Sequence, residues 1–458
     1  MLTYQLKKSP GVPLYEALYR CIRSDILGGN LKPGQKLPSK RSLARNLEIS
    51  KITVETAYGQ LLEEGYIRAC EKVGYFVETV DIPPKKQSYP QDEPAAVHKK
   101  FINLSENGTE HFPFSVWSRL LREVMLDYGE RLLLPLPNQG IPELQQAIAD
   151  HLGAFRGMEV QPRNIVIGAG ADFLYNLVIQ LLGREKIYAV EDPGYGKIRQ
   201  IYNAGGVRGC ISAAMDQEGV KPQAIRGADV LHISPTHHFP TGIVTPLSRR
   251  LELLEWAEKG EKWIIEDDYD SEFRFDAHPK PAMYTLNGER VIYMNSFSRS
   301  LSPSLRISYM ILPEVLMQRF RQRLGFYSCT VPSFEQYTLA RFLSRGFFEK
   351  HINRMRKFYR NRRNTLIAML ENCPLSDRFT ILEEDAGLHF LLKVRTEVSD
   401  RALTARLEEN GVKIRPLTDF YHEPKEDLHC FVVSYAGLRE ETLAQVLEIL
   451  ERIANSDN

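Results

Sequence analysis

Apolar residues recur every three or four positions in three early stretches of the chain, a spacing that predicts amphipathic helices. Glycines or turns separate these stretches, and serines stand where the last two helices begin and can cap them. Two short β-rich runs follow, with Gly74 near the turn between them. The predicted elements are a helix over 14–27, a short helix after Ser39, a helix after Ser50 that stops at Gly65, and strands over 66–69 and 75–78.

This order of elements is typical of a winged helix-turn-helix domain. In such a domain the second helix of the helix-turn-helix, here the one after Ser50, lies in the major groove of DNA. The residues expected to face the base edges are Ser50, Lys51, Thr53 and Thr56. Phosphate contacts are expected from Ser39, Lys40, Arg41 and Lys72. Periodicity alone leaves an alternative, a small helical domain with a solvated polar face.

From Phe101 onward, amphipathic segments alternate with short β-rich runs, which predicts an α/β domain around a mainly parallel sheet. Examples of these runs are 164–168, 187–190, 230–233, 263–265 and 291–294. Between the two parts, residues 80–100 hold four prolines and no periodicity, as in a semi-extended linker. The expected division is a DNA-binding domain over 11–79, a linker over 80–100 and an effector domain over 101–458.

Composition excludes several classes of protein. The chain has 458 residues, of which 43% are hydrophobic and 26% charged, so it is neither disordered nor of low complexity. There is no run of about 18 apolar residues for a membrane span and no apolar signal-peptide core, while six scattered cysteines fit a reducing compartment. We expect a soluble, cytoplasmic protein.

Charge is distributed unevenly between the two parts. Residues 1–86 carry 14 Lys and Arg against 9 Asp and Glu, whereas the remainder carries 45 against 49. A basic head on a mildly acidic body indicates two parts with different partners and is a weak sign of nucleic-acid binding.

The ends of the β-rich runs carry the candidate chemistry, because ligands of parallel sheets bind beyond the carboxyl ends of the strands. Gly170 and Ala171 precede a helix expected to begin at Phe173, so backbone N–H groups can approach a phosphate there. Tyr195 can place its ring over a flat ligand. Glycines at plain strand-to-helix turns and simple packing of a tyrosine are the alternatives.

The run over 263–265 is followed by acids that can bind a ring cation or a metal. One of these carboxylates can pair with a protonated ring nitrogen, and Tyr269 can donate to a phenolate-like oxygen. The acids together with His237 and His238 leave a metal site as an alternative, which is disfavoured because no His or Cys has ligand spacing around them. We therefore assign no metal ligands.

A second phosphate-binding group is expected after 291–294, where hydroxyl groups and arginines converge. Its members are Ser296, Ser298, Arg299 and Arg306.

Two sets of motifs resemble known families. The segments 37–44 (LPSKRSLA), 49–54 (ISKITV) and 61–67 (LLEEGYI) resemble the GntR family of winged-helix repressors. The strand-end segments, with 140–144 (GIPEL), 235–242 (PTHHFPTG) and 265–273 (IEDDYDSEF), resemble fold-type I pyridoxal-phosphate enzymes of the aspartate aminotransferase kind. Fused in this order, they resemble the MocR/GabR subfamily of transcriptional regulators.

The resemblance implies pyridoxal 5′-phosphate (PLP) as cofactor, double-stranded DNA as a partner and a homodimer. It places PLP phosphate at Gly170, Ala171, Ser296, Ser298 and Arg306, with Tyr195 stacked on the ring, Asp267 at the pyridine nitrogen and Tyr269 at the ring hydroxyl. The small-molecule effector is PLP itself, an amino acid or amine, or their adduct.

Position 299 departs from the family pattern. The family motif reads Ser-Phe-Ser-Lys, and its lysine forms a Schiff base with the cofactor, whereas this chain has Arg299. Arginine stays protonated and offers no free amine, so we expect non-covalent binding and no catalytic residues. An engineered or incidental substitution in a site that still binds PLP is the alternative for this residue.

Two further positions bear on the effector. Phe239 stands where aminotransferases commonly have Asn, and Val432 aligns with their carboxylate-binding arginine. Arg415 or Lys197 can take over that contact. The favoured function is therefore a regulator with an inactive aminotransferase-like domain. A working PLP aminotransferase with a DNA-binding appendage and a cofactor-free scaffold remain the rivals.

Overall fold

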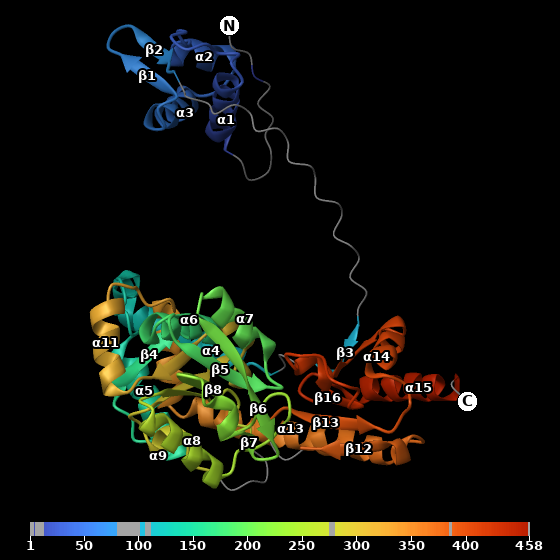
Figure 1. Cartoon of the computed structure of the whole chain (residues 1–458). Coiled ribbons are helices and arrows are strands. Elements are labelled where there is room, and N and C mark those ends of the chain that lie inside the picture. Colours follow the sequence, from blue (N-terminus) through green and yellow to red (C-terminus); the bar gives the residue numbers. More distant parts are fainter. Residues whose placement is uncertain are drawn as a thin grey trace. The chain divides into compact units, whose positions relative to one another are not determined.

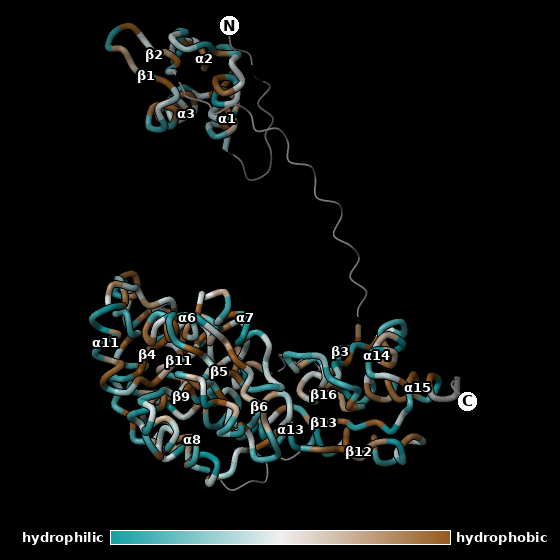
Figure 2. Tube along the Cα trace, viewed as in Figure 1, coloured by the Kyte–Doolittle hydropathy of each residue, from teal (hydrophilic) through white to brown (hydrophobic). Residues whose placement is uncertain are grey.

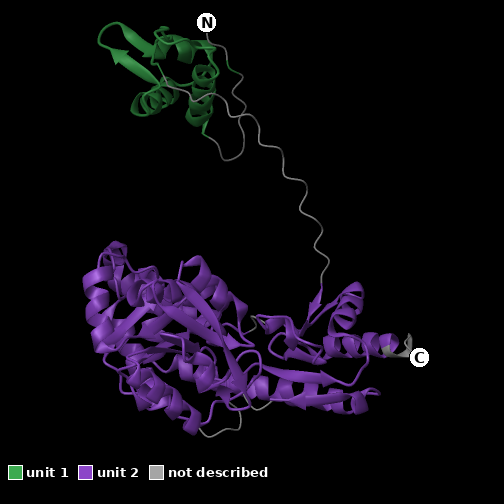
Figure 3. Ribbon diagram, viewed as in Figure 1, with its two compact units in different colours: residues 1–98 green, residues 99–458 purple. Residues whose placement is uncertain are grey.

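The computed structural model describes residues 4, 13–79, 101–105, 111–273, 280–383 and 387–456. The chain divides into two compact units, residues 1–98 and 99–458 (Figure 3). The linker predicted over 80–100 lies outside the described residues. No helix in the described ranges has the length and apolar character needed to cross a membrane.

The described residues of the first unit, 4 and 13–79, form three helices and a β-hairpin, in the predicted order (Figure 1). Its elements are α1 (Leu14–Leu27), α2 (Lys40–Asn46), α3 (Lys51–Glu63), β1 (Ile67–Cys70) and β2 (Gly74–Val77). Both predicted caps are present, because the hydroxyl of Ser39 accepts from the Ser42 N–H and that of Ser50 from the Thr53 N–H. Each strand was predicted one residue away from its observed position: β1 begins and ends one residue later, and β2 one residue earlier. The turn between them is correspondingly shorter, with Lys72 at a positive φ of 60° and Gly74 paired directly with Cys70.

A large, mostly parallel sheet organises the second unit, as predicted. Its strand order is β4-β11-β10-β9-β8-β5-β6-β7, with parallel pairing from β10 through β9, β8 and β5 to β6. The strands are β4 (Ile165–Gly168), β5 (Ile187–Asp192), β6 (Gly209–Asp216), β7 (Gly219–Val220), β8 (Val230–Ile233), β9 (Trp263–Asp267), β10 (Val291–Ser296) and β11 (Ser308–Ile311). β6, β7 and β11 were not among the example runs taken from the sequence, and β11 lies antiparallel to both of its neighbours.

Helices pack on both faces of this sheet. Consecutive residues of β9 show the two faces, because Ile264 packs in a cluster with Leu253 of α8 and Ile265 in a cluster with Leu174 of α6. Such strands are buried on both sides and are therefore almost continuously hydrophobic, as the colouring of the central strands in Figure 2 shows. The helices of this part are α4 (Phe114–Tyr128), α5 (Pro142–Arg156), α6 (Ala171–Leu182), α7 (Gly196–Ala204), α8 (Leu247–Lys259), α9 (Met283–Leu286), α10 (Phe297–Ser300), α11 (Glu314–Leu324) and α12 (Ser333–Ser344).

A smaller antiparallel sheet follows the long helix α13 (Phe347–Glu371). Its strand order is β12-β13-β16-β15, and a separate short pair joins β14 to β3. The remaining elements are β3 (Ile102–Asn103), β12 (Phe379–Leu382), β13 (His389–Val394), α14 (Asp400–Glu409), β14 (Val412–Lys413), β15 (Arg415–Pro416), β16 (Cys430–Ser434) and α15 (Glu440–Ser456). This sheet brings residues distant in sequence to the candidate site described next.

Candidate functional site

A cavity of about 350 Å³ is lined by residues at the carboxyl ends of the parallel strands and by residues of the smaller sheet. It brings together ten of the eleven residues predicted to bind the cofactor or the effector. These are Ala171, Tyr195, Lys197, Asp267, Tyr269, Ser296, Ser298, Arg299, Arg306 and Arg415. The eleventh, Gly170, adjoins the guanidinium of Arg306.

Serine hydroxyls form one wall of this cavity. Ser296 donates to the hydroxyl of Ser298 at 2.9 Å and accepts from Ser308 at 2.8 Å. The Ser296 hydroxyl also caps α10 by accepting from the backbone N–H of Ser298 at 3.1 Å. The hydroxyls are thus held in fixed positions, and Ser308 is a contributor that the sequence did not reveal.

The start of α6 forms another part of the cavity lining. The predicted start at Phe173 was wrong by two residues, because Gly170 serves as N-cap and the helix begins at Ala171. Gly170 has a positive φ of 91°, and a Cβ there would lie 2.4 Å from Nη2 of Arg306. A side chain at position 170 would therefore displace the arginine from the helix start.

Two cations at the cavity share one carboxylate. Asp172 accepts from Lys197 Nζ at 2.7 Å and from Arg306 Nη2 at 3.2 Å. Burial alone would raise the pKa of Asp172, but the two cations outweigh it and hold the pKa below its ordinary value. The positive charge available to a ligand is consequently smaller than that of Lys197 and Arg306 taken together.

Asp267, at the end of β9, is almost fully buried and bonded within the protein. The hydroxyl of Tyr175 donates to its Oδ2, and Nε2 of His232 lies 3.6 Å from the same atom. The hydroxyl of Tyr202 in turn lies 2.6 Å from Nδ1 of His232. Tyr175, His232 and Tyr202 lie on α6, β8 and α7, and no local sequence pattern links them to Asp267.

Tyr269 and Arg299 lie on the side of the cavity nearest the smaller sheet. The hydroxyl of Tyr269 is 3.3 Å from Nδ1 of His237, and the same nitrogen lies 2.7 Å from Oδ2 of Asp270. The guanidinium carbon of Arg299 is 5.9 Å from the centre of the Tyr269 ring. Burial, followed by the charge of Asp270, raises the pKa of Tyr269 well above its ordinary value, so this phenol stays protonated.

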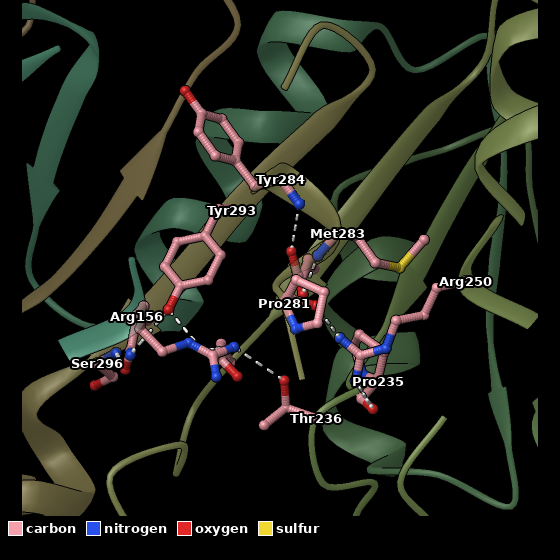
Figure 4. A network of polar contacts seen from close by, with 12 residues as sticks. Arg156, Pro235, Thr236, Arg250, Pro281, Met283, Tyr284, Tyr293 and Ser296 are labelled. Carbon is pink, nitrogen blue, oxygen red and sulfur yellow. Dashed lines mark hydrogen bonds and ion pairs between the residues drawn. The ribbon is translucent and has the colours of Figure 1, made fainter. Parts of the chain in front are cut away.

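A buried polar network supports the end of β9 (Figure 4). Arg156, the last residue of α5, pairs with Asp268 at 3.0 Å and donates to Thr236 at 3.3 Å. Tyr293 donates to Asp268 at 2.6 Å. Because breaking a buried pair leaves an uncompensated charge, this network fixes the strand end that carries Asp267.

The same network accounts for the other acids of this segment. Both carboxylate oxygens of Glu266 accept from backbone N–H groups, those of Met283 and Tyr284, at 2.9 Å. Arg250 is fully buried and donates to three backbone carbonyls. Among the described residues, no group of three His, Cys, Asp or Glu side chains could hold a metal ion.

In the first unit, Arg41, Lys51, Thr56 and Lys72 are exposed, as their predicted contact with DNA requires. Three other features modify the predicted surface. The Lys40 ammonium pairs with Glu55 at 2.7 Å. The hydroxyl of Thr53 lies 2.8 Å from that of Ser50, and Thr56 donates to a backbone carbonyl of its own helix.

Two exposed residues of α3 were missed by the sequence prediction. Ile52 is 74% exposed although it is apolar, and Glu55 also faces solvent. The sequence analysis assigned neither residue to a face of the helix. The burial of Val54 and Ala57 fixes the rotation of α3 and leaves Ile52 and Glu55 on its solvent side.

Comparison with known proteins identifies the family. The description "Aminotransferase class I and II" matches residues 99–450, and "Bacterial regulatory proteins, gntR family" matches 14–77. The HTH-type transcriptional regulator YdeL of Bacillus subtilis is 35% identical, with 98% of each chain covered. The probable rhizopine catabolism regulatory protein MocR of Rhizobium meliloti is 30% identical over 97% of this chain and 94% of that one. The chain belongs to the MocR-type family of transcriptional regulators.

Other relatives of this MocR-type regulator point the same way. The pyridoxine biosynthesis regulator PdxR of Corynebacterium glutamicum is 30% identical, covering 93% of this chain and 92% of that one. Kynurenine aminotransferase from Pyrococcus horikoshii shares the fold, with a TM-score of 0.67, 24% identity and coverage of 78% and 92%. The prediction of a transcriptional regulator is thereby confirmed, and the GntR domain implies DNA binding. The aminotransferase fold implies PLP binding.

The smaller sheet of this MocR-type regulator clarifies the departure at position 432. Val432 is buried in β16, and Arg415 of β15 is its direct cross-strand partner. Directly opposite residues in an antiparallel pair present their side chains on the same face. Arg415, which lines the cavity, is thus the neighbour of the position where aminotransferases are expected to carry their arginine.

Proposed function

We propose that this regulator binds PLP in the cavity without a covalent bond, does not catalyse transamination, and changes its DNA binding when an effector binds. The observation that carries the proposal is the gathering of the predicted residues around one cavity that has Arg299 in place of the expected lysine. Each assignment below extends from that arrangement.

The chemistry of the lining residues fits a phosphorylated pyridine. Phosphate would be held by the hydroxyls of Ser296 and Ser298, by the helix start at Gly170 and Ala171, and by Arg306. The approach of Arg306 to Gly170, which a Cβ would prevent, supports this assignment. When bound, PLP supplies an aldehyde and a ring that is electron-withdrawing once its nitrogen is protonated.

Three other side chains would orient the ring. The buried Asp267 would pair with the ring nitrogen. The hydrogen bond that it accepts from Tyr175, and the ring of His232 beside it, support a carboxylate in a fixed position. Tyr269 would donate to the ring hydroxyl. Tyr195, which is 48% exposed and 6.1 Å from Phe239 between ring centres, would cover the ring face.

Arg299 is the reason that we propose no catalysis. A guanidinium remains protonated and has no lone pair on an amine for attack on an aldehyde. It also cannot accept a proton from a bound substrate, so the site lacks a proton shuttle at this position. The chain therefore has no catalytic residue in our proposal.

The effector would be PLP itself, an amino acid or amine, or their adduct. A carboxylate on it would contact Arg415, whose guanidinium also stacks 4.0 Å from the Phe420 ring centre and lies 3.9 Å from Asp419. Lys197 is a second candidate, although its pairing with Asp172 weakens that assignment.

We further propose a cytoplasmic homodimer in which α3 of each first unit contacts DNA. Large apolar residues are exposed at α4 and the following turn Gly129–Leu133, and an unusually apolar exposed surface is typical of a protein interface. They are Phe114, Met125, Leu126, Leu133 and Leu134. All six cysteines are free thiols, which supports the cytoplasm.

Equilibrium dialysis of the full chain against PLP tests the cofactor assignment, with absorbance of ligand released after denaturation as the readout. We expect saturable binding that Arg306→Ala weakens, and no transamination of a panel of amino acids. A chain that binds no PLP at millimolar ligand would be a cofactor-free scaffold. Robust transamination would restore the enzyme alternative.

A further inference from the structure

Arg299 lies where two cavities meet. It lines the 350 Å³ cavity and also a much smaller one of about 10 Å³, which Tyr269 and Phe239 share with it. Its guanidinium carbon lies over the ring of Tyr269, 5.9 Å from the ring centre. Within the described ranges, no carboxylate pairs with this guanidinium, and no oxygen accepts a hydrogen bond from it.

The nearby acids cannot compensate this charge because they are already engaged. Asp270 holds His237 at 2.7 Å. Asp172 holds Lys197 and Arg306, and Asp267 accepts from Tyr175. Arg299 is half-buried, so its charge is partly removed from water, and no partner for it lies within the described part of the chain. A ligand that brings an acceptor or a negative charge would supply what the protein does not.

We propose that Arg299 makes the cavity select among pyridine 5′-phosphates according to the substituent that faces it. A guanidinium only donates hydrogen bonds and is always charged. Ligands with an aldehyde or carboxylate oxygen are retained, and ligands with a cationic aminomethyl group are repelled. The inference rests on the proposed function, because it requires that the phosphate and ring occupy the cavity and that position 299 faces the substituent, as the family resemblance implies.

This selection gives the regulator a defined input. PLP and pyridoxamine 5′-phosphate share the ring and the phosphate, so the serine hydroxyls, Arg306 and Asp267 treat them alike. Arg299 is the residue positioned to tell them apart. The protein would then respond to the aldehyde or acid form of the ligand and ignore the amine form.

Isothermal titration of the full chain with three ligands tests the proposal: PLP, pyridoxamine 5′-phosphate and 4-pyridoxic acid 5′-phosphate. The acid and the amine are the decisive pair, because neither can form a Schiff base with surface lysines. We expect the acid to bind at least tenfold more tightly than the amine. Arg299→Gln should reduce that ratio to near one, chiefly by improving binding of the amine.

Arg208→Gln is the matched control, since it removes the same charge from an exposed position outside the cavity. It should leave the ratio unchanged. Equal binding of acid and amine by the unaltered chain, or a ratio that Arg299→Gln does not change, would overturn the selection while leaving the proposed function intact. Failure of all three ligands to bind would overturn both.

Discussion

At the scale of single residues, position 299 separates a site that holds its ligand by hydrogen bonds from one that captures it covalently. The surrounding serines, Arg306 and Asp267 line one cavity, and in our proposal they hold a phosphorylated ring there. A lysine in the same setting could lose its proton and attack the aldehyde, which arginine cannot do. The difference is therefore testable by restoring one amine.

Arg299→Lys should create a covalent link to PLP that borohydride makes permanent. After reduction and digestion, the peptide containing position 299 should gain a pyridoxyl group in the variant and remain unmodified in the unaltered chain. Mass spectrometry of both proteins measures this directly. A pyridoxyl group on that peptide of the unaltered chain would contradict non-covalent binding.

Glu272 gives a prediction on pH dependence. This residue is 4% exposed, its Oε2 has no hydrogen-bond partner among the described residues, and burial raises its pKa to about 8. The folded chain then keeps a proton that the unfolded chain releases between about pH 4.5 and 8, so stability falls as pH rises through that window. Relative to Glu272→Gln, the unaltered chain should lose about 1.4 kcal/mol of unfolding free energy per pH unit.

Urea unfolding followed by tryptophan fluorescence measures this effect. All three tryptophans, Trp117, Trp256 and Trp263, lie in the second unit, so the signal reports that unit alone. Glu397→Gln at an exposed position is the control and should show no such trend. Parallel curves for the chain and Glu272→Gln at every pH would show that Glu272 is ionised in the folded state.

At the scale of elements, α2 and α3 present charged and apolar groups with different expected tasks. Arg41→Ala should weaken binding to all DNA sequences and reduce the salt slope of log K by about one, because it removes a phosphate contact. Fluorescence anisotropy across salt concentrations, on the protein's own upstream DNA and on unrelated DNA, measures both. An unchanged slope would mean that α2 does not face the backbone.

Ile52→Ala provides the contrast within the same pair of helices. An exposed apolar side chain near the start of a recognition helix can contact a thymine methyl group. This variant should change the preference among sequences and leave the salt slope as it was. The two variants together distinguish positioning from sequence reading.

Local patterns predicted the elements well, and long-range pairing explains what they missed. The caps at Ser39 and Ser50 depend on bonds to residues three positions away, which a sequence shows directly. The partners of Asp267 come from Tyr175 and His232, and no local spacing links them. The cross-strand pairing of Arg415 with Val432 likewise exists only in the folded sheet.

At the scale of the whole molecule, the exposed apolar residues of α4 and the turn after it predict the oligomeric state. Leu126 and Leu133 are 78% and 75% exposed, which is costly for a monomer in water. The double variant Leu126→Glu, Leu133→Glu should convert a dimer into a monomer and reduce DNA affinity. Light scattering of the full chain after gel filtration measures the mass.

Leu247 and Leu251 on α8 serve as the control for that experiment. They are also exposed, at 45% and 51%, but lie on a different helix. Replacing both with Glu should leave the dimer intact. Dissociation by the α8 variant alone would place the interface there instead.

Asp172 gives the site a property that concerns time rather than affinity. It pairs with both Lys197 and Arg306, at 2.7 and 3.2 Å, so an arriving phosphate must compete with a carboxylate that never diffuses away. A tethered competitor acts at a high effective concentration, which weakens the hold on the ligand and speeds its departure. If Arg299 forms no covalent bond to the ligand, as we propose, nothing at that position slows the exchange, and the occupied fraction follows the free ligand concentration both when it rises and when it falls. A regulator that senses the concentration of its ligand requires such reversible binding, whereas an enzyme that keeps its cofactor through every turnover does not.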